Sequence, residues 1–131
     1  MPVPPVRRVT ALPTTQSIAR SSGEALGQVA DLGEVLGLSH LRCHYEVLEP
    51  GRRMSRPHHH TRREECVYVI AGHPTLLWGG ASRGLGPGDV VALPAGPPAH
   101  SIHNEADHAA SLWVVSATPE EDRVVFAPTE P

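Results

Sequence analysis

Lysine is absent from this sequence of 131 residues, and all eleven of its basic side chains are arginines. Without lysine the chain cannot form a Schiff base with a carbonyl substrate, and it lacks the lysine of a phosphate-binding loop. The formal net charge of −3 at neutral pH indicates no basic surface for nucleic acid or for an anionic membrane. We therefore expect neither of these partners.

Long apolar runs and cysteines are also scarce. No apolar run approaches the roughly twenty residues that a membrane span needs, and the first fifteen residues carry arginines but no apolar signal-peptide core. These two absences lead us to expect a cytoplasmic protein with no membrane partner. Cys43 and Cys66 lie in apolar stretches without CxxC spacing, which favours buried free thiols over a disulfide or a reactive thiol.

Proline and glycine, by contrast, are plentiful, with 14 and 12 residues. They separate short apolar runs, of which Glu65–Ala71, Thr75–Trp78 and His100–His103 are typical strands. Runs of this kind follow one another at hairpin spacing through residues 39–127. The pattern predicts one all-β domain over that range, an antiparallel barrel or sandwich.

The first 38 residues have a different character. Residues 1–20 are interrupted by prolines and predict an irregular or edge-strand arm, while residues 23–37 show a weak helical period broken by glycines. We expect an N-terminal segment, residues 1–38, that packs on the barrel and contains at most one short helix.

Residues 40–48 alternate between apolar and polar side chains. Because successive side chains of a strand point to opposite faces, the polar face would carry Arg42, His44 and Glu46 and would lie on the outside. A substrate contact is the alternative role for His44.

Nine histidines is a high number for this length, and His58 and His60 are two residues apart beside a predicted strand. Such residues point to the same face, so the two imidazoles can aim at one point while His59 points away. A carboxylate, Glu65, follows five residues later, and His100 opens another predicted strand. Three imidazoles and one carboxylate suit a single divalent transition metal ion such as Zn, Mn, Fe, Ni or Cu.

These residues also fall into two motifs that resemble those of the cupin family. The first is His58-x-His60-x4-Glu65-x6-Gly72, and the second is Gly88-x5-Pro94-x-Gly96 followed by His100-x3-Asn104. The resemblance, to small single-domain bacterial cupins, implies a double-stranded β-helix or jelly-roll barrel with a metal near its mouth. It also implies that His58, His60, Glu65 and His100 are the metal ligands, with Glu64 as the alternative to Glu65, and that two chains pair as a homodimer.

Two functions fit such a site. The first is a metal-dependent enzyme that oxygenates a small organic acid or phenol, or isomerises a sugar or keto acid. The second is a non-catalytic module that binds a metal or small ligand as a sensor or scaffold. Around the metal motif lies a cluster of arginines, which is either a solvated face or an attractant for an anionic ligand: Arg52, Arg53, Arg56, Arg62 and Arg63.

Overall fold

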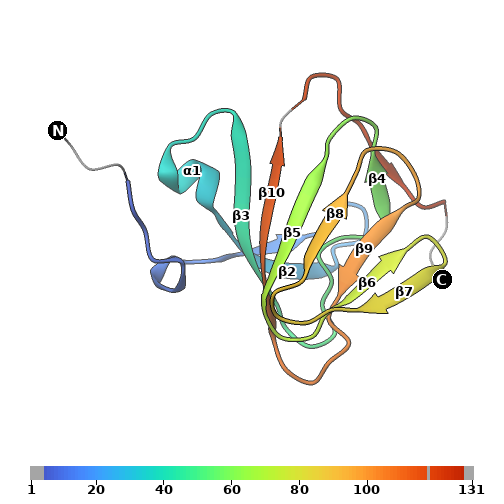
Figure 1. Ribbon diagram of the computed structural model, residues 1–131, viewed down its shortest axis with the longest axis horizontal. Coiled ribbons are helices and arrows are strands. Elements are labelled where there is room, and N and C mark those ends of the chain that lie inside the picture. Colours follow the sequence, from blue (N-terminus) through green and yellow to red (C-terminus); the bar gives the residue numbers. More distant parts are fainter. Residues whose placement is uncertain (1–4, 118, 129–131) are drawn as a thin grey trace.

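The computed structural model of this chain describes residues 5–117 and 119–128. Its described strands form two antiparallel sheets (Figure 1). The larger sheet contains, in spatial order, β1 (Thr15–Ile18), β2 (Ala25–Asp31), β3 (Leu41–Leu48), β10 (Ala110–Ala117), β5 (Glu65–Ala71) and β8 (Val90–Leu93). The smaller sheet contains β11 (Val124–Phe126), β4 (His58–His60), β9 (His100–His103), β6 (Thr75–Trp78) and β7 (Ala81–Gly84). The predicted all-β jelly-roll barrel is confirmed.

The core lies between the two sheets and is made of side chains that alternate along each strand. On β10, for example, Leu112 and Val114 are buried against Val67 and Val69 of β5. The strands predicted over Glu65–Ala71, Thr75–Trp78 and His100–His103 begin and end at those residues. Short apolar runs between Pro/Gly turns were therefore sufficient to locate them.

The helix expected within residues 23–37 is much shorter than the sequence pattern suggested. Residues Ala25–Asp31 form strand β2, and only Leu32–Leu36 form the helix α1. Pairing of β2 with β3 provides backbone hydrogen bonds that a glycine-interrupted helix could not match. Asp31 ends the strand and begins α1, because its carboxylate accepts the Glu34 N–H at 3.0 Å.

Near the cavity, the face of β3 that was predicted to lie outside, which carries His44 and Glu46, lies inside the barrel. Glu46 and Leu48 are buried, and His44 lines the interior with Glu46. Cys43, on the opposite face of β3, is buried as well, because α1 packs on that face from outside the barrel. Polar residues point inward here because this end of the barrel interior is a cavity. Both thiols are free, but Cys66 is exposed, so its predicted burial is wrong.

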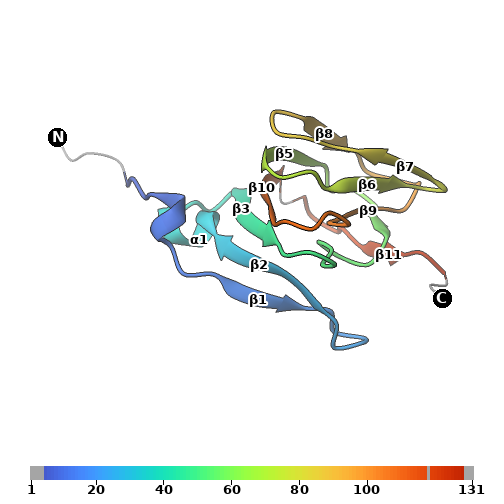
Figure 2. The same ribbon diagram turned by 90° about the horizontal axis from the view of Figure 1, so that it is seen from below.

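The hairpin of β1 and β2 extends the larger sheet at the edge away from β8 (Figures 1 and 2). Arginines from the segment after β3 hold its tip. Arg53 donates two hydrogen bonds to the Glu24 carboxylate, at 2.8 and 2.7 Å, and Arg56 donates one to Ser21 at 2.8 Å. Arg52 reaches a carbonyl at the start of β2 at 3.1 Å. Three members of the predicted arginine cluster therefore fasten the hairpin beside the cavity.

None of the described residues, 5–117 and 119–128, belongs to a helix with the length and apolar character needed to cross a membrane.

Candidate metal centre

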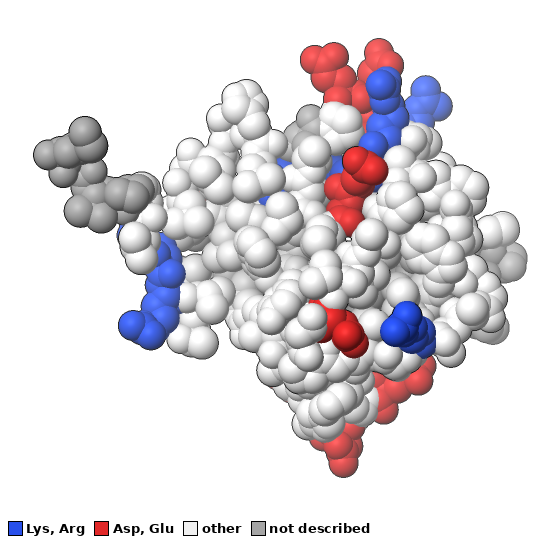
Figure 3. All heavy atoms as spheres, viewed as in Figure 1, with Lys and Arg blue, Asp and Glu red and all other residues white. Residues whose placement is uncertain are grey.

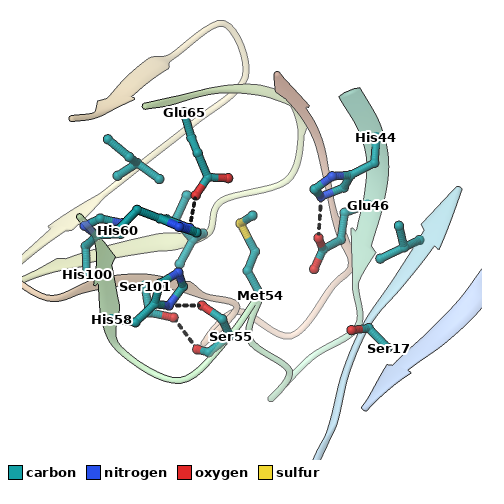
Figure 4. A pocket seen from close by; sticks show the side chains of 13 residues that line it. Ser17, His44, Glu46, Met54, Ser55, His58, His60, Glu65, His100 and Ser101 are labelled. Carbon is teal, nitrogen blue, oxygen red and sulfur yellow. Dashed lines mark hydrogen bonds and ion pairs between the residues drawn. The ribbon is translucent and has the colours of Figure 1, made fainter. Parts of the chain in front are cut away.

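A cavity of about 300 Å³ opens at one end of the barrel interior (Figure 4). Strands of both sheets line it, together with Ser17 and Val29 from the N-terminal hairpin. The residues that line it include all four predicted metal ligands: His58, His60, Glu65 and His100.

Three of these four side chains converge most closely. One ligand atom from each of His58, Glu65 and His100 lies within 4.8 Å of the other two. His58 and His100 are register partners on the neighbouring strands β4 and β9, and Glu65 begins β5 in the facing sheet. A cation between them would thus join the two sheets.

Hydrogen bonding orients the His58 ring. Its Nδ1 lies 2.8 Å from the Arg56 carbonyl oxygen and 3.1 Å from the Ser55 hydroxyl. A carbonyl can only accept, so Nδ1 carries the proton and the Nε2 lone pair is left for a ligand. Burial lowers the pKa of His58, which keeps the imidazole neutral, as metal binding requires.

His100 is 2% exposed, yet neither of its ring nitrogens has a hydrogen-bond partner of good geometry. Burial lowers the pKa of His100, and the nearby Pro98 carbonyl only partly opposes this effect. Trp78 stacks on the ring, with centroids 5.6 Å apart and planes at 12°. A buried, neutral and unpartnered imidazole held flat in this way is suited to coordination, because an unsatisfied buried polar group is otherwise costly.

His60 is held between two carboxylates. Its Nε2 lies 3.1 Å from Glu65 Oε1, and its Nδ1 lies 2.7 Å from Asp122 Oδ2. The hydrogen bond to Glu65 raises the pKa of His60; burial opposes this and Asp122 adds to it. Burial alone would raise the pKa of Glu65, but the bond from His60 leaves it below its usual range. Glu65 is therefore ionised and available as an anionic ligand.

Asp122 is a functional residue that the sequence analysis missed. Its Oδ1 accepts the Arg62 and Arg63 backbone N–H groups at 2.9 and 2.8 Å, while Oδ2 accepts from His60. Burial acts to raise its pKa, but these hydrogen bonds lower it to about 2. The pairing of β11 with β4 brings Asp122 there across 62 residues of sequence, and no local motif signals it.

The donor set fits a divalent transition metal ion. Imidazole nitrogens and one carboxylate oxygen are borderline ligands, and Asp122 fixes the His60 tautomer in the way carboxylates fix metal-bound histidines. His60 Nε2 and Glu65 Oε1 can approach to 3.1 Å only if a proton or another cation lies between the two acceptors.

Apart from His44 and the three histidines among the predicted ligands, the histidines of the described residues do not line this cavity. His73 and His108 form an exposed pair in the loops before β6 and β10, with His73 Nδ1 3.2 Å from His108 Nε2. Neither His59 nor His103 is among the lining residues, and Glu64 is exposed. On the wall facing the predicted metal ligands lie His44 and Glu46, which the alternation of residues 40–48 predicted to lie outside (Figure 4).

Comparison with known proteins gives a family and a group of similar folds. The family model described as "Cupin domain" matches residues 44–116, which span β3 to β10 and include all four predicted ligands. No curated protein matches the chain.

Two solved structures are close to a third identical to this chain over the aligned residues. The putative sugar phosphate isomerase from Acidithiobacillus ferrooxidans is 32% identical over 76% of this chain and 64% of its own, with a TM-score of 0.73. A sugar phosphate isomerase of the cupin superfamily from Silicibacter pomeroyi is 30% identical over 79% of this chain and 66% of its own, with a TM-score of 0.75. This chain thus spans slightly less than two thirds of their length.

The polyketide cyclase RemF from Streptomyces resistomycificus aligns over 96% of this chain and 87% of its own, with a TM-score of 0.78. At 19% identity this match shows a common fold alone. The family model, both predicted motifs and the jelly-roll barrel agree, and the chain belongs to the cupin family as a small single-domain member.

Proposed function

We propose that this protein is a metal-dependent enzyme of the isomerase type that acts on a small oxygen-bearing molecule. The observation that carries the proposal is the convergence of His58, Glu65 and His100 within 4.8 Å on the wall of a cavity that a small molecule can enter. His60, whose Nε2 touches Glu65, is the fourth proposed ligand. A divalent ion held there would supply Lewis acidity toward a carbonyl or hydroxyl oxygen.

The protein's own residues give the site its shape. His58 is oriented by the Arg56 carbonyl and His100 by the Trp78 ring, so both imidazole rings are held in place before any ligand binds. Met54 and Leu93 add apolar surface to the cavity, which excludes water from around a bound ligand and strengthens polar contacts within it.

The isomerase type is favoured over the oxygenase type by the two similar structures named sugar phosphate isomerases. A phosphate group on the substrate has less support. No arginine is among the described residues that line the cavity, and each arginine of the predicted cluster contacts this chain itself. The proposed substrate is therefore an oxygen-bearing carbon skeleton, and the proposal does not include a phosphate group on it.

The test begins with protein purified without a histidine tag and loaded separately with Zn, Mn, Fe, Ni and Cu. Each form is incubated with a panel of aldoses, ketoses and hydroxy-keto acids, and interconversion is followed by proton NMR. The proposal predicts turnover that stops when a chelator removes the metal and returns on reloading. A loaded protein that binds panel members without converting any would favour the non-catalytic binding module.

We also propose that two copies of this chain pair through the outer face of the larger sheet. Trp113 is the register partner of both Tyr45 and Tyr68, and Tyr68 is in turn the partner of Val90. This row of apolar side chains crosses four strands, and over the middle of β10 and β5 the visible surface is mostly uncharged (Figure 3). A sedimentation mass near that of one 14.0 kDa chain at micromolar concentration would refute the dimer.

A further inference from the structure

We propose that Glu46 and His44 form a proton-transfer pair, and that the substrate is an α-hydroxycarbonyl compound whose α-proton is taken by Glu46. The inference rests on the proposed function and adds to it the base and the substrate class. It starts from the position of the pair, which lies on β3 across the cavity from the metal-ligand cluster (Figure 4).

The geometry of the pair forms a path from the cavity toward solvent. His44 Nε2 and Glu46 Oε1 are 3.0 Å apart, and the two residues share one face of β3 because they are two positions apart. The His44 side chain is 30% exposed, whereas that of Glu46 is 4% exposed. A proton on the Glu46 carboxyl group can therefore reach water through the His44 imidazole without crossing the cavity.

The second oxygen of Glu46 is the feature that points to a ligand. Oε2 is fully buried and has no hydrogen-bond partner among the residues that the structure describes. Buried carboxylate oxygens are normally satisfied, and unsatisfied ones in native structures call for an explanation. Burial also raises the pKa of this carboxyl group, and the hydrogen bond from His44 opposes that effect. A group of this kind, at the wall of a ligand-sized cavity, has the properties of a general base.

The sequence of β2 makes room for this carboxyl group. A Cβ atom at position 27 would lie 2.7 Å from Glu46 Cδ, so the absence of a side chain at Gly27 leaves free the space that this carboxyl group occupies. Across the sheet, Glu46 and His44 face Leu112 and Val114 of β10. The surroundings of the carboxyl group thus hold it in one place.

Few charged groups face the pair. Asp31 of β2 is the register partner of His44. Glu65 acts on the Glu46 carboxyl group from β5 and raises its pKa. Arg42 and Arg63 share a surface depression with His44, Asp31 and Glu65. Among the described residues, His44 is the one that hydrogen-bonds to the Glu46 carboxyl group and can take up its proton.

The proposed step is balanced by proton transfer alone. The α-carbon–hydrogen bond of the substrate breaks, its electron pair moves toward the carbonyl carbon, and the proton bonds to Glu46 Oε2. The hydroxyl proton moves to the other oxygen of the resulting enediolate, Glu46 returns its proton to the neighbouring carbon, and the carbonyl and hydroxyl groups thereby exchange positions. His44 stabilises ionised Glu46 through Oε1 and exchanges protons with water. No oxidant or reductant is needed.

The test uses the metal-loaded full chain and two probes. Dihydroxyacetone in D2O reports α-proton exchange by NMR, and glycolohydroxamate, a planar mimic of an enediolate, reports binding by calorimetry. We expect Glu46→Gln to slow exchange by about 100-fold or more, since general bases contribute about 10²- to 10⁴-fold. His44→Asn should slow exchange less and change its pH profile. Gly27→Ala, which keeps the carboxyl group but displaces it, should also lower the exchange rate.

Metal content, measured on every variant, separates this inference from the proposed function. Failure of the unmodified protein to hold a metal would overturn the proposed function. Unmodified, metal-loaded protein that neither exchanges nor binds the probes would overturn the substrate class. Glu46→Gln protein with full metal and unchanged exchange would overturn the role of Glu46, and loss of metal from Glu46→Gln would place Glu46 in the metal site instead. Retained metal with lost exchange is the expected result.

Discussion

Replacing Asp122 with alanine should weaken metal binding although Asp122 is not itself a proposed ligand. The change removes the acceptor that holds His60 Nδ1 at 2.7 Å and frees the ring to rotate. Carboxylates that orient metal-bound histidines typically contribute about 10- to 100-fold in metal affinity. We expect a loss of that size, about 1.4 to 2.7 kcal/mol, when bound metal is titrated against a chromophoric chelator at pH 7.5.

The same variant should also be less stable without metal. Asp122→Ala leaves the Arg62 and Arg63 N–H groups without their acceptor, and a lost bond to a charged group costs about 1.5 to 3 kcal/mol. The pKa of Asp122 is about 2, below its ordinary 3.8, so its contribution is present above pH 4 and is lost as pH falls toward 2. The difference between a pKa of 3.8 and one of about 2 bounds that contribution at about 2.4 kcal/mol, before solvent screening.

Asp107→Ala is the matched control. Asp107 also accepts from a histidine, at 3.0 Å from His108 Nδ1, but it is fully exposed and does not line the cavity. This variant should keep both metal affinity and stability within experimental error. Equal metal affinity of Asp122→Ala and the unmodified protein would refute the assigned role of Asp122.

Three further outcomes are expected. Bound metal should fall as pH drops below about 6, because imidazole must be neutral to bind a metal. Burial lowers the pKa of His58 and His100, so these two rings become protonated at a lower pH than a free imidazole does. Metal retained at pH 4 would contradict this expectation. A chelator should lower the melting temperature without unfolding the barrel, whose buried core cluster contains none of the four proposed ligands, and outright unfolding on circular dichroism would show a structural metal. Arg53→Ala should loosen the hairpin tip at Glu24 and speed hydrogen exchange in β1 and β2, and unchanged exchange would contradict that attachment.

Much of the barrel follows from local sequence pattern. The strands Glu65–Ala71 and His100–His103 are short apolar or β-branched runs set off by turn residues, and Glu65–Ala71 alternates in its middle as a half-buried strand does. The two cupin motifs identified four candidate ligands, and strand periodicity predicted that His58 and His60 point to the same side. These parts of the prediction depend on residues a few positions apart, which sequence spacing encodes directly.

The parts that could not be predicted depend on long-range pairing. β2 is a strand because β3 lies beside it, not because its own sequence excludes a helix. Glu46 points inward because the interior at that level is a cavity, which no alternation pattern can distinguish from solvent. Asp122 reaches His60 only through the pairing of β11 with β4. In each case the decisive partner is far away in the sequence.

Metal binding by the proposed ligands can be measured on the full chain, purified without a histidine tag and analysed by elemental mass spectrometry. We expect one divalent transition ion per chain, and sharp loss of it in His58→Ala, His100→Ala and Glu65→Gln. His59→Ala is the control, because His59 lies on the same strand but does not line the cavity, and it should keep its metal. Equal loss from His58→Ala and His59→Ala, or the absence of any transition metal from protein exposed to all five ions, would contradict the account.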